Sequence, residues 1–218
     1  MSILRIVPII LFVQVLFSPH VLSQSSLSKE YVVKEIQKKY SAVENISADF
    51  VQKTRFKFSS QEQIQSGSVI IGKDNKFKII VPQQLIVSDG KTVWVYSEPA
   101  NQVLINTFKQ MNTIPSPERL LQGLSKDFEV STMTVDSGTV SLSLVPVHGM
   151  LHGATITEMT LTATQNDWTV HRVNFTETNG TSVSVEFSHI RFNNTFSSKE
   201  FELTPDPSAH IIDLRKKQ

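Results

Sequence analysis

The stretch IVSDGKTVWVY, residues 86–96, decides the fold class of this 218-residue chain. Asp89-Gly90 is a typical two-residue hairpin turn, and apolar, β-forming segments lie on both sides of it. In the second strand, Trp94 and the tyrosine two residues further on share one face, while Val93 and the next valine share the other. A hairpin that is apolar on both faces needs cover on both, or one face contacts something other than protein for part of the time.

The same two-residue period predicts strands along most of the chain. In SADFVQKTRFKF, residues 47–58, Ala48, Phe50, Phe56 and Phe58 are expected on one face. Further strands are expected at 64–72, 76–81, 84–89, 91–97, 102–106, 128–135, 139–147, 156–165, 168–178, 181–196 and 201–204. Asn179-Gly180 predicts a type I′ hairpin turn. Short connections between consecutive strands favour an antiparallel meander.

Two segments have helical periodicity. Residues 28–46 carry apolar side chains three and four apart between lysines, which predicts an amphipathic helix. In SPERLLQGL, residues 116–124, a serine N-cap is followed by proline at the first helical position. We therefore expect one domain, a large antiparallel sheet with two or three helices on one face.

The N-terminal segment predicts export. Residues 1–23 combine a single charge, Arg5, with an apolar run and a short polar exit, as in a secretory signal peptide. The alternative, a membrane anchor, is less favoured because the run is short for a bilayer span. The remaining residues 24–218 form one domain with 20 basic and 20 acidic residues, since the chain has 21 and 20 and Arg5 is removed. A neutral chain does not favour nucleic-acid binding, and the lack of cysteine excludes disulfides and thiolate chemistry.

Motifs for catalysis are missing from the sequence. It contains no Gly-x-Ser-x-Gly, phosphate-loop or His-Glu-x-x-His pattern, and its six histidines have no common ligand spacing. His148 and His152 could approach each other in a loop, but no carboxylates accompany them. We predict no enzyme activity, no catalytic residue, no metal site and no cofactor.

The sequence supplies more apolar surface than simple alternation requires. Segments such as SVIIG and FKIIV carry large aliphatic side chains without strict alternation. A curved sheet and its helices could enclose an apolar cavity, or the same side chains could interlock as a dry core. Physical reasoning alone leaves these two interpretations open.

Three blocks of sequence carry a resemblance to a known family. SADFVQK, GSVIIGKDNKFKIIV and IVSDGKTVWVYSEPANQV follow the N-terminal helix in order, with PSPERLL and FELTP further on. Together they resemble the outer-membrane lipoprotein carrier family, LolA, over essentially all of residues 24–218. The block at 88–96 is the most specific part.

The resemblance implies a mainly β fold with helices: a single large curved antiparallel sheet, an incomplete β-barrel, covered on its concave side by about three helices. It also implies a monomeric periplasmic chaperone that carries acylated lipoproteins as cargo from an inner-membrane ABC transporter to an outer-membrane lipoprotein receptor. The expected acyl-binding residues are Phe50, Ile71, Phe77, Ile79, Trp94, Leu120 and Leu121.

One position departs from the family pattern. Where the family carries Arg-Pro, this chain has Lys73 and Asp74, with Phe77 kept. The resemblance implies that Lys73 contacts the lid, with a point charge in place of the planar guanidinium. A binding module for another amphiphile, such as a glycolipid or hopanoid, is the alternative function.

Overall fold

The computed structural model of the chain describes residues 27–59, 61–111, 124, 128–147 and 156–215. Twelve strands form one sheet in the order β12-β6-β5-β4-β3-β2-β1-β11-β10-β9-β8-β7. The strands are β1 (Asn45–Arg55), β2 (Glu62–Gly72), β3 (Lys76–Val81), β4 (Gln84–Asp89), β5 (Thr92–Ser97), β6 (Gln102–Thr107), β7 (Phe128–Asp136), β8 (Thr139–Pro146), β9 (Ile156–Thr164), β10 (Val170–Glu177), β11 (Ser182–Phe192) and β12 (His210–Asp213). The described residues also form one α-helix, α1 (Lys29–Ser41), and two 3₁₀ helices, η1 (Phe108–Met111) and η2 (Ser198–Phe201).

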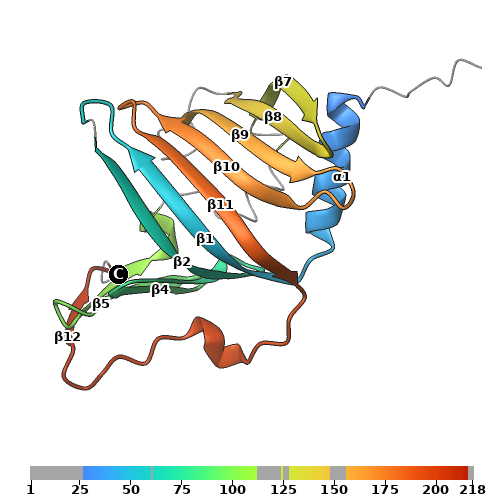
Figure 1. Cartoon of the computed structure of the whole chain (residues 1–218). Helices are drawn as coiled ribbons and strands as arrows, with labels where there is room; N and C mark the ends of the chain where they lie inside the picture. The colour runs from blue at the N-terminus through green and yellow to red at the C-terminus, as the bar shows by residue number, and fades with distance from the viewer. Residues whose placement is uncertain (1–26, 60, 112–123, 125–127, 148–155, 216–218) are drawn as a thin grey trace, which may run out of the picture.

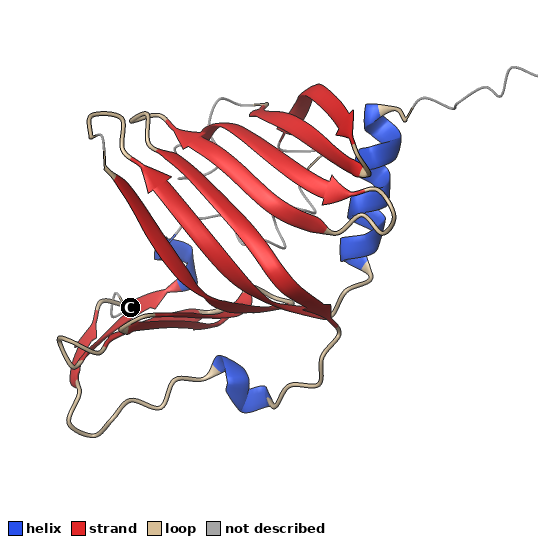
Figure 2. Ribbon diagram, in the orientation of Figure 1, coloured by secondary structure: helices blue, strands red, loops and turns tan. Residues whose placement is uncertain are grey.

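The sheet is open and strongly curved (Figures 1 and 2). Strands β4 and β5 run across the lower ends of β1, β2 and β11 in this view, and α1 lies beside the right-hand ends of β7–β10. The expected single large curved sheet is therefore confirmed. One detail of the expectation is wrong, because β12 pairs with β6 in parallel and the other neighbours are antiparallel. In the described residues β7 and β12 form the two edges, so the barrel is incomplete.

The N-terminal helix forms where its period predicts but ends earlier. Ser28 caps it by accepting a hydrogen bond from the Tyr31 N–H at 3.1 Å. The helix ends at Ser41, not near residue 46, because the chain enters β1 at Asn45. The expected middle helix at 116–124 lies outside the described residues apart from Leu124. Cover by three helices is therefore not supported.

The two predicted turns form hairpins, but with other backbone geometry. Ser88 and Val93 are the last pair of β4 and β5, which leaves residues 89–92 without a partner in the register of these two strands. Asp89 stabilises this turn by accepting hydrogen bonds from the Lys91 N–H at 2.8 Å and from the Thr92 N–H at 2.7 Å. At the β10–β11 turn only Gly180 has a positive φ, of 81°, whereas a type I′ turn needs a second positive φ at Asn179. The type I′ prediction is therefore wrong.

Two further strand predictions need correction. β1 ends at Arg55, so Phe56 and Phe58 lie in the exposed turn after it and do not continue the apolar face of Phe50. The strand expected at 201–204 is absent: Phe201 closes η2 and the following residues have no regular structure. The final strand β12 was not predicted.

The register separates the sheet into two faces. The inner face carries Phe77, whose ring lies 6.4 Å from that of Phe108 in η1. The outer face carries Lys78, which pairs with Glu200 of η2 at 2.8 Å. The segment containing η2 therefore crosses β3 and β4 on the outside, as Figure 1 shows.

This C-terminal segment explains why the opening hairpin is apolar on both faces. Val87 and Val103 point to the outer face and are fully buried. Phe201 of η2 lies against the backbone of Gly72, where a β-carbon would approach its ring to 3.1 Å. Trp94 shares the outer face with Val87, as its cross-strand partner. On its β4 strand, the second face of the hairpin is thus covered by the chain's own C-terminal segment.

Candidate functional site

Apolar side chains form continuous rows across the inner face of the sheet. Residues directly opposite on paired strands share a face, so the register defines each row. One row, from β1 to β6, consists of Ala48, Val69, Ile79, Ile86, Val95 and Leu104. The adjacent row contains Ile46, Ile71, Phe77 and Val93, interrupted by Ser88. The inner face of β1–β6 is therefore an extended apolar surface.

The two halves of the inner face differ in cover. Under α1, the β8 and β9 side chains Leu142, Leu144, Met159 and Leu161 are at most 2% exposed. On the β1–β3 and β11 half, a small buried cluster of Ala48, Phe50, Val69 and Val81 is surrounded by apolar side chains that stay partly exposed. These are Ile71, Ile79, Val185, Phe187 and Ile190. One half is a dry core, and the other is an incompletely covered apolar surface.

The structure brings four of the predicted site residues together on this surface. Phe50, Ile71, Phe77 and Ile79 all belong to the inner face of β1–β3. Trp94 is on the opposite face, so it does not line this surface. Leu120 and Leu121 lie outside the described residues.

Sequence analysis did not single out the contribution of β11. Phe187 pairs with Phe50 and Val185 with Gln52, which places both on the inner face beside β1. The alternation in SVSVEFSHI, residues 182–190, predicts one apolar face formed by Val183, Val185 and Phe187. That β11 lies beside β1, however, is a pairing between distant segments that periodicity does not specify.

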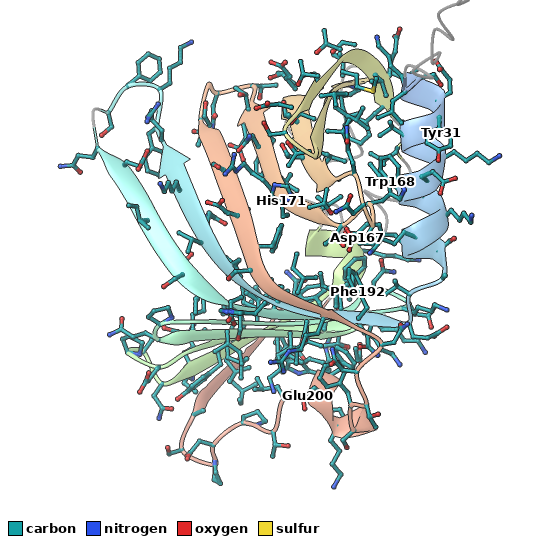
Figure 3. The ribbon with its side chains drawn as sticks, turned by 45° about the vertical axis from the view of Figure 1, so that its right-hand side comes forward. Tyr31, Asp167, Trp168, His171, Phe192 and Glu200 are labelled. Atoms are coloured by element: carbon teal, nitrogen blue, oxygen red, sulfur yellow. The ribbon has the colours of Figure 1, made fainter. Side chains whose placement is uncertain are left out.

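Helix α1 is fixed to the turn between β9 and β10 by polar contacts. The Val170 N–H donates to the Tyr40 hydroxyl at 2.9 Å, and Lys39 donates to Asp167 at 3.3 Å and to Thr169 at 2.8 Å. Figure 3 shows Asp167 and Trp168 turned toward the helix. These contacts hold α1 in place against the β9–β10 end of the sheet.

Aromatic contacts support the same arrangement. Tyr31 meets the ring of Trp168 edge-on (Figure 3), with ring centres 5.9 Å apart, and Tyr40 meets the ring of Phe192 at 6.1 Å. The Lys39 ammonium lies 4.4 Å from the centre of the Phe192 ring. Helix α1 therefore contacts both the β9–β10 turn and the end of β11.

The pKa values of two groups reflect this packing. Burial raises the pKa of Tyr40 to about 12, because the ionised phenolate would lose solvation. For Asp167, partial burial acts to raise the pKa, but hydrogen bonds from Thr164, Thr169 and Lys39 together outweigh it. The pKa of this carboxyl is therefore held well below its ordinary value. Both groups keep one charge state at neutral pH and act as fixed structural contacts.

Comparison with known proteins identifies the family. The family model described as outer membrane lipoprotein carrier protein LolA matches residues 41–204, which is most of the chain. The chain belongs to the LolA family. The match begins at the end of α1 and includes all of β1–β11 together with η2.

Individual relatives agree over nearly the same region. An outer-membrane lipoprotein carrier protein from Haemophilus influenzae (strain PittEE) is 26% identical over 199 residues, covering 90% of this chain and 94% of the relative. Its counterpart from Methylibium petroleiphilum is 27% identical over 170 residues, covering 76% and 81%. A crystal structure of an uncharacterized conserved protein from Thermus thermophilus has a TM-score of 0.55 at 14% identity, covering 86% of this chain and 99% of that one. The last likeness is one of fold alone.

Lys73, expected from the sequence to contact the lid, lies in the turn between β2 and β3. Its ammonium pairs with Glu44, in the connection between α1 and β1, at 2.5 Å. The Glu44 N–H in turn donates to the Asn193 side chain at 2.8 Å. Lys73 thus ties the β2–β3 turn to the segment that follows α1. Its expected contact with a lid would involve residues outside those described.

The outer face has a different character from the apolar inner surface. A shallow hollow of about 450 Å³ over β9–β11, β1 and β2 is lined mainly by polar side chains, among them Lys53, Glu158, Asn174 and Ser184. Its polar lining does not suit an acyl chain. Among the residues that the structure describes, no three His, Asp or Glu side chains gather as a metal site, and no helix is long and apolar enough to cross a membrane.

Proposed function

We propose that this chain is a periplasmic carrier of lipoproteins that holds the acyl chains of its cargo against the inner face of β1–β6 and β11. The observation that supports the proposal is the partly exposed apolar surface around Phe50. A soluble protein rarely leaves contiguous apolar surface uncovered unless that surface binds something. Phe77 and Phe108 lie on the same face and extend the surface toward η1.

The energetics of acyl chains explain why such a surface is useful. Each methylene buried is worth roughly 0.8 kcal/mol, so one long acyl chain in water is unfavourable by about 10 kcal/mol or more. A carrier must offset most of this cost and still release its cargo to an acceptor. A surface that is only partly enclosed in the free protein binds less tightly than a fully closed pocket, which favours transfer.

The proposal includes the route of export and the partners. Residues 1–23 act as a secretory signal peptide and residues 24–218 form the mature carrier in the periplasm. Lipoproteins are received from an inner-membrane ABC transporter and delivered to an outer-membrane receptor, without catalysis by this chain. The family match supports the cargo class, and the partners are carried over from the resemblance.

Mass spectrometry of co-purifying material tests this proposal. The protein is isolated from its native periplasm under mild conditions, and bound molecules are extracted and identified. Acylated lipoprotein or triacylated peptide is the expected result. Free glycolipid or hopanoid without any acylated peptide would replace the lipoprotein carrier with the alternative amphiphile-binding function.

A further inference from the structure

The turn between β1 and β2 exposes aromatic side chains at the tip of a long hairpin. Phe58 is 92% exposed and Phe56 is 44% exposed. The chain folds back through hydrogen bonds from the Ser59 N–H to the Phe56 carbonyl, 3.1 Å, and from the Gln61 N–H to the Ser59 hydroxyl, 3.1 Å. Both rings therefore lie in the turn beyond the end of β1.

Cationic side chains alternate with these rings along the hairpin. Lys53, Arg55 and Lys57 lie on the β1 side, and Glu62 on β2 pairs with Arg55 at 3.1 Å. The Lys57 ammonium is 5.4 Å from the centre of the Phe58 ring. The hairpin end thus carries three cations and one carboxylate. Glu177, at the end of the neighbouring β10, adds a second carboxylate and accepts a hydrogen bond from the Asn179 side-chain amide at 3.1 Å.

The neighbouring hairpin braces the tip. The Lys57 side chain lies against Gly180 of the β10–β11 turn, where an added β-carbon would come within 2.4 Å of the Lys57 Cδ. On the outer face, beyond the Arg55–Glu62 pair, Ile64 on β2 is 62% exposed. Cross-strand pairing of Lys53 with Ile64 keeps cationic and apolar groups side by side.

We propose that this tip, Phe56 to Phe58 with Lys53 and Ile64, docks on the surface of a lipid bilayer. Aromatic rings flanked by lysine and arginine suit the boundary between headgroups and acyl chains, where the ring is buried and the cation stays at the headgroups. Two rings on a protruding turn offer far less area than the roughly 800 Å² per partner of a typical protein interface. Insertion into a bilayer surface needs only the tip. This contact is separate from the inner face that holds acyl chains.

Vesicle sedimentation tests the proposal on the chain as secreted, which lacks the apolar N-terminal segment. Wild-type protein is expected to sediment with vesicles of phosphatidylethanolamine and phosphatidylglycerol, and more weakly with phosphatidylcholine vesicles. Phe58→Ala should lower the partition coefficient about tenfold on both, because one large apolar side chain no longer enters the bilayer. Lys57→Glu should lower the partition coefficient several-fold on the anionic vesicles alone. Added salt should reduce this difference between the variant and the wild type.

Val135→Ala is the matched control, since Val135 is a 51% exposed apolar residue on β7, an edge strand separated from β1 by four other strands. A second readout uses the lack of native cysteine. An environment-sensitive fluorophore on Ser59→Cys should shift to the blue with vesicles, and the same label on Ser137→Cys, in the turn at the other end of the strands, should not. Wild-type protein that stays in the supernatant, or Phe58→Ala that sediments like wild type, would overturn the proposal. Binding of soluble lipopeptide, measured without vesicles, is expected to be unchanged in Phe58→Ala and reports separately on the carrier function.

Discussion

Replacing Phe50 by alanine distinguishes a dry core from a ligand-binding surface. Phe50 is 9% exposed and packs beside Val69 and Val81, but its neighbours Ile79 and Phe187 stay partly exposed. A phenylalanine removed from a closed core costs about 3–5 kcal/mol, since a cavity remains. Here the vacated space opens onto accessible surface, so we expect only the transfer free energy, about 2–3 kcal/mol.

For a chain of this size, that loss lowers the melting temperature by roughly 5–10 °C. Urea unfolding gives the free energy directly, and a titration with triacylated peptide gives the affinity, which should fall in Phe50→Ala. Leu142→Ala is the matched comparison, because Leu142 is fully buried under α1, and its cost should include the cavity term. A loss above about 4 kcal/mol for Phe50→Ala, with unchanged peptide affinity, would refute the reasoning and make Phe50 a core residue.

Three other substitutions test the packing that shapes the inner face. Gly67→Ala should destabilise the fold by about 1–3 kcal/mol in urea unfolding, because the new methyl would meet the Ile80 carbonyl oxygen at 2.3 Å and a backbone atom cannot rotate away; an unchanged midpoint would contradict this. Tyr40→Phe should cost about 1–3 kcal/mol, since the Val170 N–H loses its partner, and faster hydrogen exchange at that amide would be its signature. The lowered pKa of Asp167 stabilises the fold above the carboxyl's ordinary value of 3.8 and is lost as the pH falls below it. The stability difference between wild type and Asp167→Asn should therefore be constant near neutral pH and shrink below about pH 4; a difference independent of pH would disprove the assignment.

Local sequence patterns predicted much of the fold because most pairings in this sheet are between consecutive strands. The bounds of β3 and β4 agree with the two-residue period, and alternation correctly separated Trp94 from Val93. The four residues of β12 carry no local pattern that predicts their place, because they pair in parallel with β6, a strand about a hundred residues earlier in the chain. Helix α1 ends where β1 must begin to pair, which helical periodicity does not specify.

The site was harder to predict than the fold. Alternation could place Phe50, Ile71 and Ile79 on one face, but it could not tell which face would be covered by the C-terminal segment. Trp94 lies on the outer face, whereas the sequence suggested that it contacts a ligand on the inner one. Phe58 continued the apolar alternation of β1, yet the turn after Arg55 exposes it.

A direct binding titration tests the carrier function most simply. Protein comprising residues 24–218 is saturated with an environment-sensitive hydrophobic dye, and a triacylated peptide is then added in parallel with the same peptide lacking its acyl chains. We predict saturable dye binding and full displacement by the acylated peptide alone, because the proposed function places acyl chains on the inner face of β1–β6 and β11. Dye binding that does not saturate, or equal displacement by both peptides while circular dichroism shows an intact fold, would contradict the proposed function.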